Sequence, residues 1–167
     1  PGIFETRELL KLTLDAPYVY DEYTSTVGKN QHYGIATFSK FPIINEGKIE
    51  FKSERNNNMC IYIDVQAYGD TIRVYNVHAA SIRFSDEEYD FIQKINEDKQ
   101  EADVEIEEAL GIVERLANAY SRRAEQISLV KAHSLESPHP VVICGDFNDT
   151  PVSYTYATIS DELVDTF

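Results

Sequence analysis

The sequence predicts an α/β fold, and three parts of the chain carry this prediction. A short apolar run at 140–144 has the length and composition of a buried strand. Two further strand-like runs, at 59–66 and 71–79, are joined through a turn that contains Gly69, which is typical of a hairpin. Between 106 and 130, apolar residues recur at three- and four-residue steps, which indicates a long helix packed on a sheet.

The amino-terminal part of the chain is predicted to form a helix, a loop and strands. Residues 5–14 carry four leucines among charged residues, which favours a short helix. Residues 16–20 look extended around a proline, whereas 21–31 are polar and punctuated by glycine, which is typical of a loop. Residues 33–39 are predicted as a strand, and 48–52 alternate as a half-exposed strand does.

A capping box marks the start of a helix at Asp86. Ser85 offers its hydroxyl to the first turn, and Glu88 follows three residues later. Phe84 and Tyr89 flank the box and would pack together as a hydrophobic staple. These four side chains together predict where this helix begins.

The long helix is predicted from a single apolar stripe, which we interpret as core packing. The stripe consists of Ile106, Ala109, Leu110, Val113, Leu116, Ala117, Tyr120, Ala124, Ile127 and Val130. An acidic segment at 97–108 precedes it and is interpreted as a solvated connection or an exposed helical turn. A loop at 134–140 leads into the central strand, and a short helix follows Tyr154.

Composition and charge narrow the class of protein. A chain of 167 residues with 43% hydrophobic and 26% charged residues suits one globular domain with a substantial core. The net charge of −14 disfavours long nucleic acid as a partner, because duplex-binding proteins present a basic surface to phosphates. The acidic balance agrees better with a divalent-cation site and a small or neutral phosphoester.

Cysteine usage and targeting signals leave the compartment open. Cys60 and Cys144 both fall in apolar strand-like runs, so we expect two buried, reduced thiols. We find no signal peptide, no apolar run long enough to span a bilayer and no lipidation motif. These observations fit a cytoplasmic protein, but the chain resembles a fragment and localisation is therefore not assigned.

The run at 140–144 continues into a polar segment that organises the rest of the chain. If the strand extends that far, one face carries Val142, Cys144, Asp146 and Asn148, and the other carries Ile143 and Phe147. Thr150 and Pro151 then predict a helix start, with a hydroxyl N-cap followed by proline at the first helical position. On the local pattern alone, this segment is either a strand-end turn or a site for a hard metal or a phosphate.

A second strand becomes polar toward its end in the same way. Along 71–79, Ile72, Val74, Asn76 and His78 share one face, and the last two are polar. Two strands that each end in polar groups on one face are what a site at the rim of a sheet requires. A histidine near a strand end is otherwise more often structural.

Three blocks of sequence resemble the endonuclease/exonuclease/phosphatase superfamily, the DNase I-like proteins. In chain order they are YGIATFSKFPI at 33–43, VYNVH at 74–78 and GDFNDTPVSYTY at 145–156. The resemblance implies a four-layer α/β sandwich, with mostly antiparallel or mixed sheets and helices outside. It also implies hydrolysis of a phosphodiester or phosphomonoester with a divalent metal, Mg²⁺ or Mn²⁺, bound among acidic side chains.

The resemblance assigns roles to individual residues. Asp146 would orient or deprotonate the attacking water, and Asn148 would hold Asp146 and a phosphate oxygen in place. His78 would donate a hydrogen bond to a non-bridging phosphate oxygen. Asn76 and Ser153 would be substrate-binding neighbours, with Ser153 fixing its loop rather than reacting. Asp146 and Asn148 would be the metal ligands.

The departures from the family pattern are as informative as the matches. No strand with an asparagine and no glutamine-strand-glutamate segment precedes Tyr33, and no aspartate–histidine pair closes the chain. We therefore expect residues 1–167 to be the central portion of one such domain. Alone, this portion should be a poor catalyst and should hold a metal weakly. Its open sheet edges should invite pairing with another copy or another polypeptide.

Four further expectations complete the interpretation. The alternative function is a non-catalytic scaffold domain that binds a partner or a cation through its acidic rim. Among the remaining polar residues, His32, His133 and His139 are predicted to lie on the surface, and 56–58 to form a turn. Arg122 and Arg123 lie on the long helix, where a solvated face or an ion pair is expected.

Overall fold

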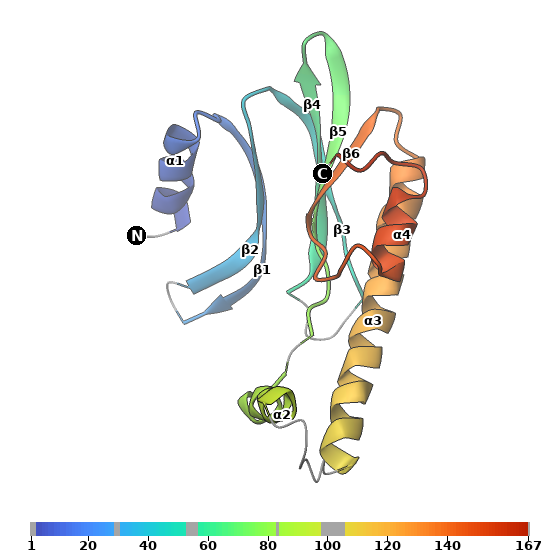
Figure 1. The fold of residues 1–167 in the computed structure, drawn as a ribbon. Coiled ribbons are helices and arrows are strands. Elements are labelled where there is room, and N and C mark those ends of the chain that lie inside the picture. Colours follow the sequence, from blue (N-terminus) through green and yellow to red (C-terminus); the bar gives the residue numbers. More distant parts are fainter. Residues whose placement is uncertain (1–2, 29–30, 53–56, 83, 98–105, 167) are drawn as a thin grey trace.

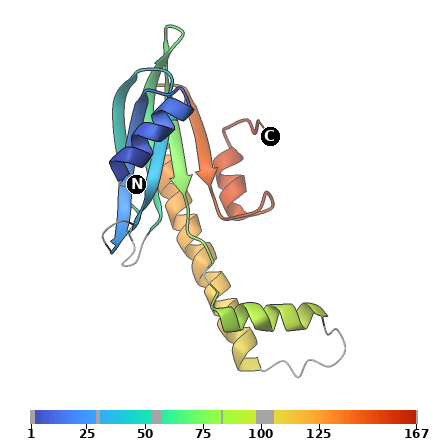
Figure 2. The same cartoon turned by 90° about the vertical axis from the view of Figure 1, so that its left-hand side faces the viewer.

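The computed structural model describes residues 3–28, 31–52, 57–82, 84–97 and 106–166. Helix α1 (Ile3–Thr13), a two-stranded sheet, a four-stranded sheet and helix α3 (Ile106–Leu135) follow one another as layers (Figure 1). Seen from the side, α1 lies over the smaller sheet (Figure 2). The prediction of an α/β sandwich with outer helices is confirmed.

The two sheets differ in size and in connection. Strands β1 (Tyr18–Val27) and β2 (Gln31–Ser39) form an antiparallel pair. The larger sheet has the order β3-β4-β5-β6, and only its last pair, β5 and β6, is parallel. Its strands are β3 (Ile43–Ile49), β4 (Met59–Ala67), β5 (Asp70–His78) and β6 (Val141–Asp146). The parallel pair is connected through α2 (Asp86–Glu97) and α3, as parallel strands require a crossover.

The larger sheet is buried on both faces, and each face has its own core. Toward the smaller sheet, β4 contributes Ile61, Ile63 and Val65, which are buried. Toward α3, Tyr75 and Val77 of β5 pack with the helix residues Ile127 and Val130, and all four are fully buried. Phe147, which follows β6, packs against this second core, as the alternation of β6 predicts.

The hairpin of β4 and β5 is confirmed at the predicted turn. Ala67 pairs with Asp70, and the two residues between them, Tyr68 and Gly69, both have positive φ. A two-residue turn with positive φ matches the twist of the flanking strands. Glycine adopts this conformation without strain, which explains its place in the turn.

Two predictions for the amino-terminal half are wrong. The segment 21–31, predicted as a loop, contains most of β1, which pairs with β2 through a bulge between Tyr23 and Ser25. The strand predicted at 48–52 is β3, which lies earlier, at Ile43–Ile49. In both cases pairing with a neighbouring strand overrides polar composition, because half-exposed strands accept polar side chains on either face.

The predicted apolar stripe of α3 is only partly buried. Ile127 and Val130 lie in the core, whereas Leu110, Val113 and Tyr120 are at least half exposed. The reason is length, since the amino-terminal half of α3 extends beyond the sheet (Figure 1). The buried face instead comprises Ala119, Arg123, Gln126, Ile127, Val130 and Ser134. It therefore includes a charged residue and an amide.

The remaining helices test two predicted caps. At α2, the amide of Ser85 donates to Glu88 and the amide of Glu88 to the Ser85 hydroxyl, so the capping box is confirmed. The start at Thr150 and Pro151 is wrong, because Ser153 caps α4 (Tyr154–Ser160) and 150–153 form a turn. Among the described helices, none is long and apolar enough to cross a membrane.

Candidate active site

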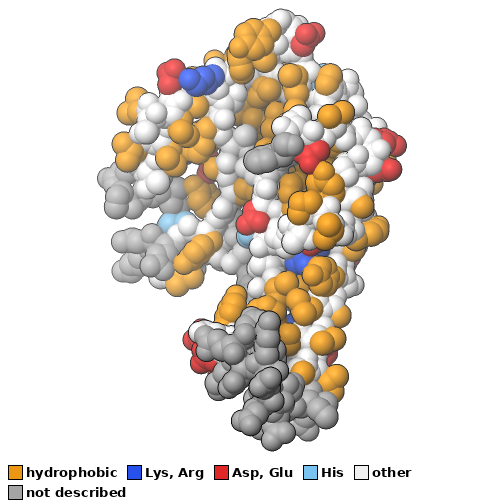
Figure 3. Space-filling view, viewed as in Figure 1, with side chains coloured by type: hydrophobic (Ala, Val, Ile, Leu, Met, Phe, Trp, Pro, Cys, Tyr) orange, Lys and Arg blue, Asp and Glu red, His pale blue; other side chains and the backbone are white. Residues whose placement is uncertain are grey.

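The ends of the parallel strands β5 and β6 bring two of the predicted site residues together. His78 and Asp146 are register partners at the last position of the pair. Residues opposite each other on neighbouring strands project to the same face of a sheet. The ring and the carboxylate therefore lie on the same face, although they are far apart in the chain. In Figure 3, acidic and histidine atoms reach the surface near the middle of the face shown.

Gly145 allows β6 to approach β5 closely just before Asp146. Its φ is 141°, a conformation that side chains rarely permit, and a Cβ here would clash with the backbone of Val77. The amide of Ala79 then donates to the Asp146 carbonyl at 2.9 Å, which extends the ladder by one bond. Glycine is thus required for the close pairing that sets His78 beside Asp146.

Asn148 supports Asp146 through a tight local turn. Its amide nitrogen donates to Asp146 Oδ1 at 2.9 Å, and its own φ is 51°, in the left-handed region. Asparagine adopts this region more readily than most residues do. The Asn148 side chain points back to the sheet, where Nδ2 donates to the Ala79 carbonyl at 3.0 Å. Asn148 therefore connects the Asp146 carboxylate to the backbone that follows His78.

His78 is oriented by one backbone contact. Its Nδ1 lies 3.0 Å from the Asn57 carbonyl, and since a carbonyl can only accept, Nδ1 carries the hydrogen. The other ring nitrogen, Nε2, carries no hydrogen in this neutral tautomer, and it can donate only when the ring is doubly protonated. The ring is half-buried and Asp146 is exposed, so both are within reach of a ligand from solvent.

The two predicted substrate-binding neighbours have structural contacts. The Asn76 Nδ2 group donates to the Ala36 carbonyl and to the Thr37 hydroxyl, both at 3.1 Å, and so links β5 to β2. The Ser153 hydroxyl accepts from the amide of Tyr156 at 3.2 Å as the cap of α4. Neither contact involves Asp146 or His78, and a role in substrate binding stays a prediction for both.

The donor set at Asp146 suits only a loosely held cation. Among the described residues, no three His, Cys, Asp or Glu side chains converge as a dedicated metal site requires. Mg²⁺ is nevertheless often bound by one or two carboxylates, with water and substrate phosphate completing the shell. An exposed carboxylate with an adjacent amide fits that description, and weak binding by Asp146 and Asn148 stays a prediction.

Arg123 forms an ion pair, which is one of the two alternatives predicted for it, but its burial behind the site was not predicted. Arg123 of α3 is 1% exposed and donates through Nε to Asp149 Oδ2 at 3.1 Å and through a terminal nitrogen to the Ala80 carbonyl at 2.8 Å. Burial alone would raise the pKa of Asp149, but hydrogen bonds from Thr155 and Thr150 and the charge of Arg123 hold it below its usual value. The sequence signal that could have indicated this role is the position of Arg123 on the buried face of the helix.

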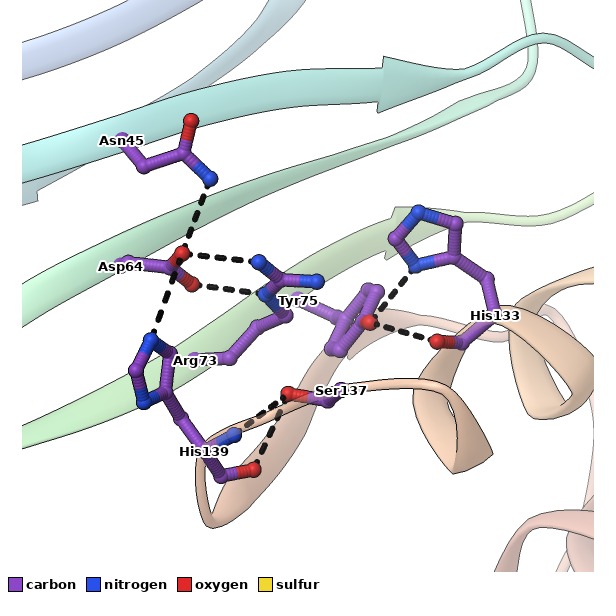
Figure 4. A network of polar contacts seen from close by, with 7 residues as sticks. All are labelled: Asn45, Asp64, Arg73, Tyr75, His133, Ser137 and His139. Atoms are coloured by element: carbon purple, nitrogen blue, oxygen red, sulfur yellow. Dashed lines mark hydrogen bonds and ion pairs between the residues drawn. The ribbon is translucent and has the colours of Figure 1, made fainter.

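A second polar cluster lies at the opposite end of β5. Arg73 forms a bidentate ion pair with Asp64, at 2.6 and 2.7 Å, and Asn45 donates to the same carboxylate (Figure 4). His139 reaches Asp64 at 4.0 Å. The hydrogen bonds from Arg73 outweigh burial and lower the pKa of Asp64.

His133 and His139, predicted to lie on the surface, are half-buried and make polar contacts with the larger sheet. The Tyr75 hydroxyl lies 2.7 Å from His133 Nδ1 and also donates to the His133 carbonyl, at 3.3 Å (Figure 4). Burial lowers the pKa of His133, and the positive charge of Arg73 adds to this effect. His133 and His139 thus contribute to the second cluster, while His32 contacts Thr26 on the smaller sheet.

The cysteines differ from each other. Cys60 is fully buried, as predicted, and burial raises the pKa of its thiol to about 12. Cys144 is exposed on β6, which contradicts the prediction, and its Sγ contacts the Tyr75 carbonyl at 3.2 Å. Cys144 is the register partner of Asn76, so it lies on the face turned toward the smaller sheet, and β6, at the edge of the larger sheet, is covered less completely on this face than β4 is.

A family model described as the endonuclease/exonuclease/phosphatase family matches residues 4–166. Beta toxin of Staphylococcus aureus, in a variant with bound magnesium ions, is similar in structure, with a TM-score of 0.57 and 19% identity over 92% of this chain and 51% of that one. No protein of curated function matched the sequence.

Two further solved structures are similar. Sphingomyelinase C from Streptomyces griseocarneus has a TM-score of 0.55 and 18% identity, over 94% of this chain and 52% of that one. The human Nocturnin catalytic domain with a bound sulfate anion has a TM-score of 0.54 and 16% identity, over 95% and 52%. The chain thus spans about half the length of these structures.

Proposed function

The chain belongs to the endonuclease/exonuclease/phosphatase family, and from this premise we propose that it carries part of the active site of a divalent-metal-dependent phosphoesterase. The observation that carries the proposal is the register pairing of His78 with Asp146 at the open end of β5 and β6. The bound magnesium of the beta toxin structure and the bound sulfate of the Nocturnin structure support a cation and a tetrahedral anion as ligands of this fold.

The contacts define what each residue would do. Asp146 is exposed, and one carboxylate oxygen is fixed by the Asn148 amide, so the other oxygen can orient or accept a proton from a water. His78 already donates through Nδ1 to Asn57, and its doubly protonated ring would donate through Nε2 to a phosphate oxygen. Asn148 would keep Asp146 aligned with the backbone after β5.

A magnesium or manganese ion would be held by the Asp146 carboxylate and the Asn148 amide oxygen. When bound, it would supply positive charge that offsets the charge of a phosphoester. Because this donor set is small, we expect weak binding and low turnover from residues 1–167 alone. The net charge of −14 favours a small phosphoester over long nucleic acid as the substrate.

The test compares Asp146, at the carboxyl end of β6, with Asp70, at the amino end of β5. Asp146→Asn should abolish magnesium-dependent turnover of an activated phosphodiester, such as bis(p-nitrophenyl) phosphate. Asp70→Asn removes the same charge at the exposed hairpin turn and should leave turnover unchanged. Equal turnover in wild type and Asp146→Asn would contradict the proposal and favour the non-catalytic scaffold. A magnesium titration followed by NMR at Asp146 would then show whether that scaffold binds a cation.

The outer edge of β6 supports a proposal about partners. Among the described strands, none pairs with that edge, and Val142 on it is 49% exposed. Open edges of this kind pair with other strands. We infer that two copies associate through β6 at high concentration. Sedimentation velocity should show dimers that Val142→Lys reduces, and a monomer at all concentrations would refute the inference.

A further inference from the structure

Two buried alanines after β5 form the junction between the two halves of the candidate site. Ala79 and Ala80 are 0% and 3% exposed, and they directly follow His78. The Ala79 amide donates to the Asp146 carbonyl, while the Ala79 carbonyl accepts from Asn148 at 3.0 Å and from Asn58 at 2.8 Å. These hydrogen bonds join the end of β5 to the segment of Asp146 and Asn148 and to Asn58, which adjoins the Asn57 carbonyl that orients His78.

Ala80 is held from the other side by helix α3. Its amide donates to the Gln126 side chain at 2.8 Å, and its carbonyl accepts from Arg123 at 2.8 Å. A buried backbone without regular secondary structure needs such partners, because unpaired polar groups are costly to bury. The two helix side chains thus satisfy the backbone at the point where the chain leaves β5.

Arg123 connects this junction to the loop after β6. Its guanidinium donates to Ala80 from one nitrogen and to Asp149 from another, and the side chains of Arg123 and Asp149 are 1% and 5% exposed. The planar fork of arginine can bind two partners in fixed directions, which a lysine cannot reproduce. One side chain therefore sets the spacing between the loop after His78 and the loop after Asp146.

We propose that Arg123, assisted by Gln126, is a positioning residue that acts beyond the end of the β5–β6 ladder and holds the loops after His78 and Asp146 together through Ala80 and Asp149. The inference rests on the proposed phosphoesterase function for its catalytic consequence. Its structural consequence, the alignment of the two loops, stands independently of turnover. Arg123 has no contact with the solvent-facing side of the site and acts only through these loops.

The experiment compares two adjacent arginines of one helix. Arg122 is exposed and donates to the Asn118 carbonyl of its own helix, so Arg122→Met is a matched control for charge and side-chain type. We expect Arg123→Met to lower kcat on bis(p-nitrophenyl) phosphate by about 10- to 100-fold, the range of a small misplacement, with KM within about twofold. Arg122→Met should match wild type in both, and Arg123→Lys should recover only part of the loss.

A double variant separates positioning from stability. Arg123→Met leaves the Asp149 carboxylate buried without its cation, and Arg123→Met with Asp149→Asn removes that charge and should regain part of the lost thermal stability. If Arg123 positions the loops, kcat stays low in the double variant. If kcat returns together with stability, the role is only structural and the proposal is overturned.

If neither wild type nor any variant shows turnover, the proposed phosphoesterase function is refuted, but the positioning role of Arg123 is not. Amide NMR then tests the positioning role by itself. Arg123→Met should shift the resonances of His78, Asp146 and Asn148 and accelerate hydrogen exchange at Ala79 and Ala80. The β4–β5 hairpin should remain protected as in wild type. Unchanged resonances at the three site residues, or a uniform change across the whole sheet, would overturn the positioning role.

Discussion

Two buried arginine–carboxylate pairs lie within the described part of the chain, one near each end of the β5–β6 pair. Arg73 and Asp64 meet in a bidentate contact at 2.6 and 2.7 Å, with 10% and 4% of their side chains exposed. Arg123 and Asp149 meet through one nitrogen at 3.1 Å, with 1% and 5% exposed. The chemistry is the same, but the elements that each pair joins are different.

The difference lies in what holds the partners when the ion pair is absent. Arg73 and Asp64 are register partners on neighbouring antiparallel strands, so the backbone ladder keeps them together. Arg123 and Asp149 belong to a helix and a loop that share no ladder. The first pair therefore adds stability to an alignment that a ladder already sets, whereas the second joins two loops that lie beyond the end of the β5–β6 ladder. Position within the hydrogen-bond network, more than burial, separates a structural ion pair from one that shapes a site.

Removal of Arg73 should have the largest effect on stability and little effect on the site. Arg73→Met leaves the Asp64 carboxylate buried without its cation, which typically costs about 3–5 kcal/mol. The free energy of unfolding, measured by urea denaturation, should fall by this amount. The amide resonances of Asp146 and Asn148 should stay within experimental error of wild type. Displaced resonances at these two residues would show that the Arg73–Asp64 pair also influences the candidate site, which would contradict the comparison.

Gly145→Ala should have an intermediate effect and should act at the site end. The φ of 141° and the clash with Val77 would strain the backbone, at a cost of about 1–3 kcal/mol. The bond from Ala79 to the Asp146 carbonyl should weaken, and hydrogen exchange at Ala79 would report this loss. As a control, Gly111→Ala on α3, where nothing lies within 4 Å of a Cβ, should not destabilise the protein.

A fall in pH should lower the free energy of unfolding through His133, which belongs to the cluster that contains Arg73 and Asp64. Burial and the charge of Arg73 lower the pKa of His133 in the folded chain, so the unfolded chain binds this proton at higher pH. The contribution to stability is complete above about pH 6.5 and is lost as the pH falls toward the folded value. The slope cannot exceed about 1.4 kcal/mol per pH unit for one proton. Urea denaturation between pH 7.5 and 5 should show this slope in wild type, and His133→Phe should reduce it.

The smallest effect is expected for the hydroxyl that holds His133. Tyr75→Phe removes the hydrogen bonds to His133 Nδ1 and to its carbonyl and should cost about 0.5–1.5 kcal/mol. The aromatic contact of ring 75 with His133, at 5.6 Å between centroids, should survive the change. A loss well above this range in thermal or urea denaturation would mean that the second cluster depends on the hydroxyl more than its geometry indicates.

The juxtaposition of His78 and Asp146 could be predicted from the sequence because both residues lie at strand ends. The alternation along 71–79 and 140–148 places His78 and Asp146 each on a definite face, and the register of the parallel pair then brings them together. Periodicity was only partly successful for α3, where Ile127 and Val130 of the predicted stripe are buried but Arg123 and Gln126 are buried beside them. A pattern of apolar residues cannot identify which polar residue will be buried, because that depends on partners elsewhere in the chain.

Other misses have a similar cause. The polar strand β1 owes its structure to pairing with β2, and the residues of β1 alone resemble a loop. His133 is half-buried because Tyr75 of a distant strand lies opposite it. The helix start at Thr150 and Pro151 was locally plausible, but Ser153 caps the helix that forms. Interactions between distant segments decided each of these outcomes.

The parallel pairing of β5 with β6 also has a consequence for how the protein acquires its chemistry. His78 and Asp146 come together only after α2 and α3 have crossed from one strand to the other. Contacts that close so long a stretch of chain form late and slowly. A nascent or partly unfolded chain therefore lacks the pairing of His78 with Asp146, and the proposed phosphoesterase activity would require that β6 has docked on β5.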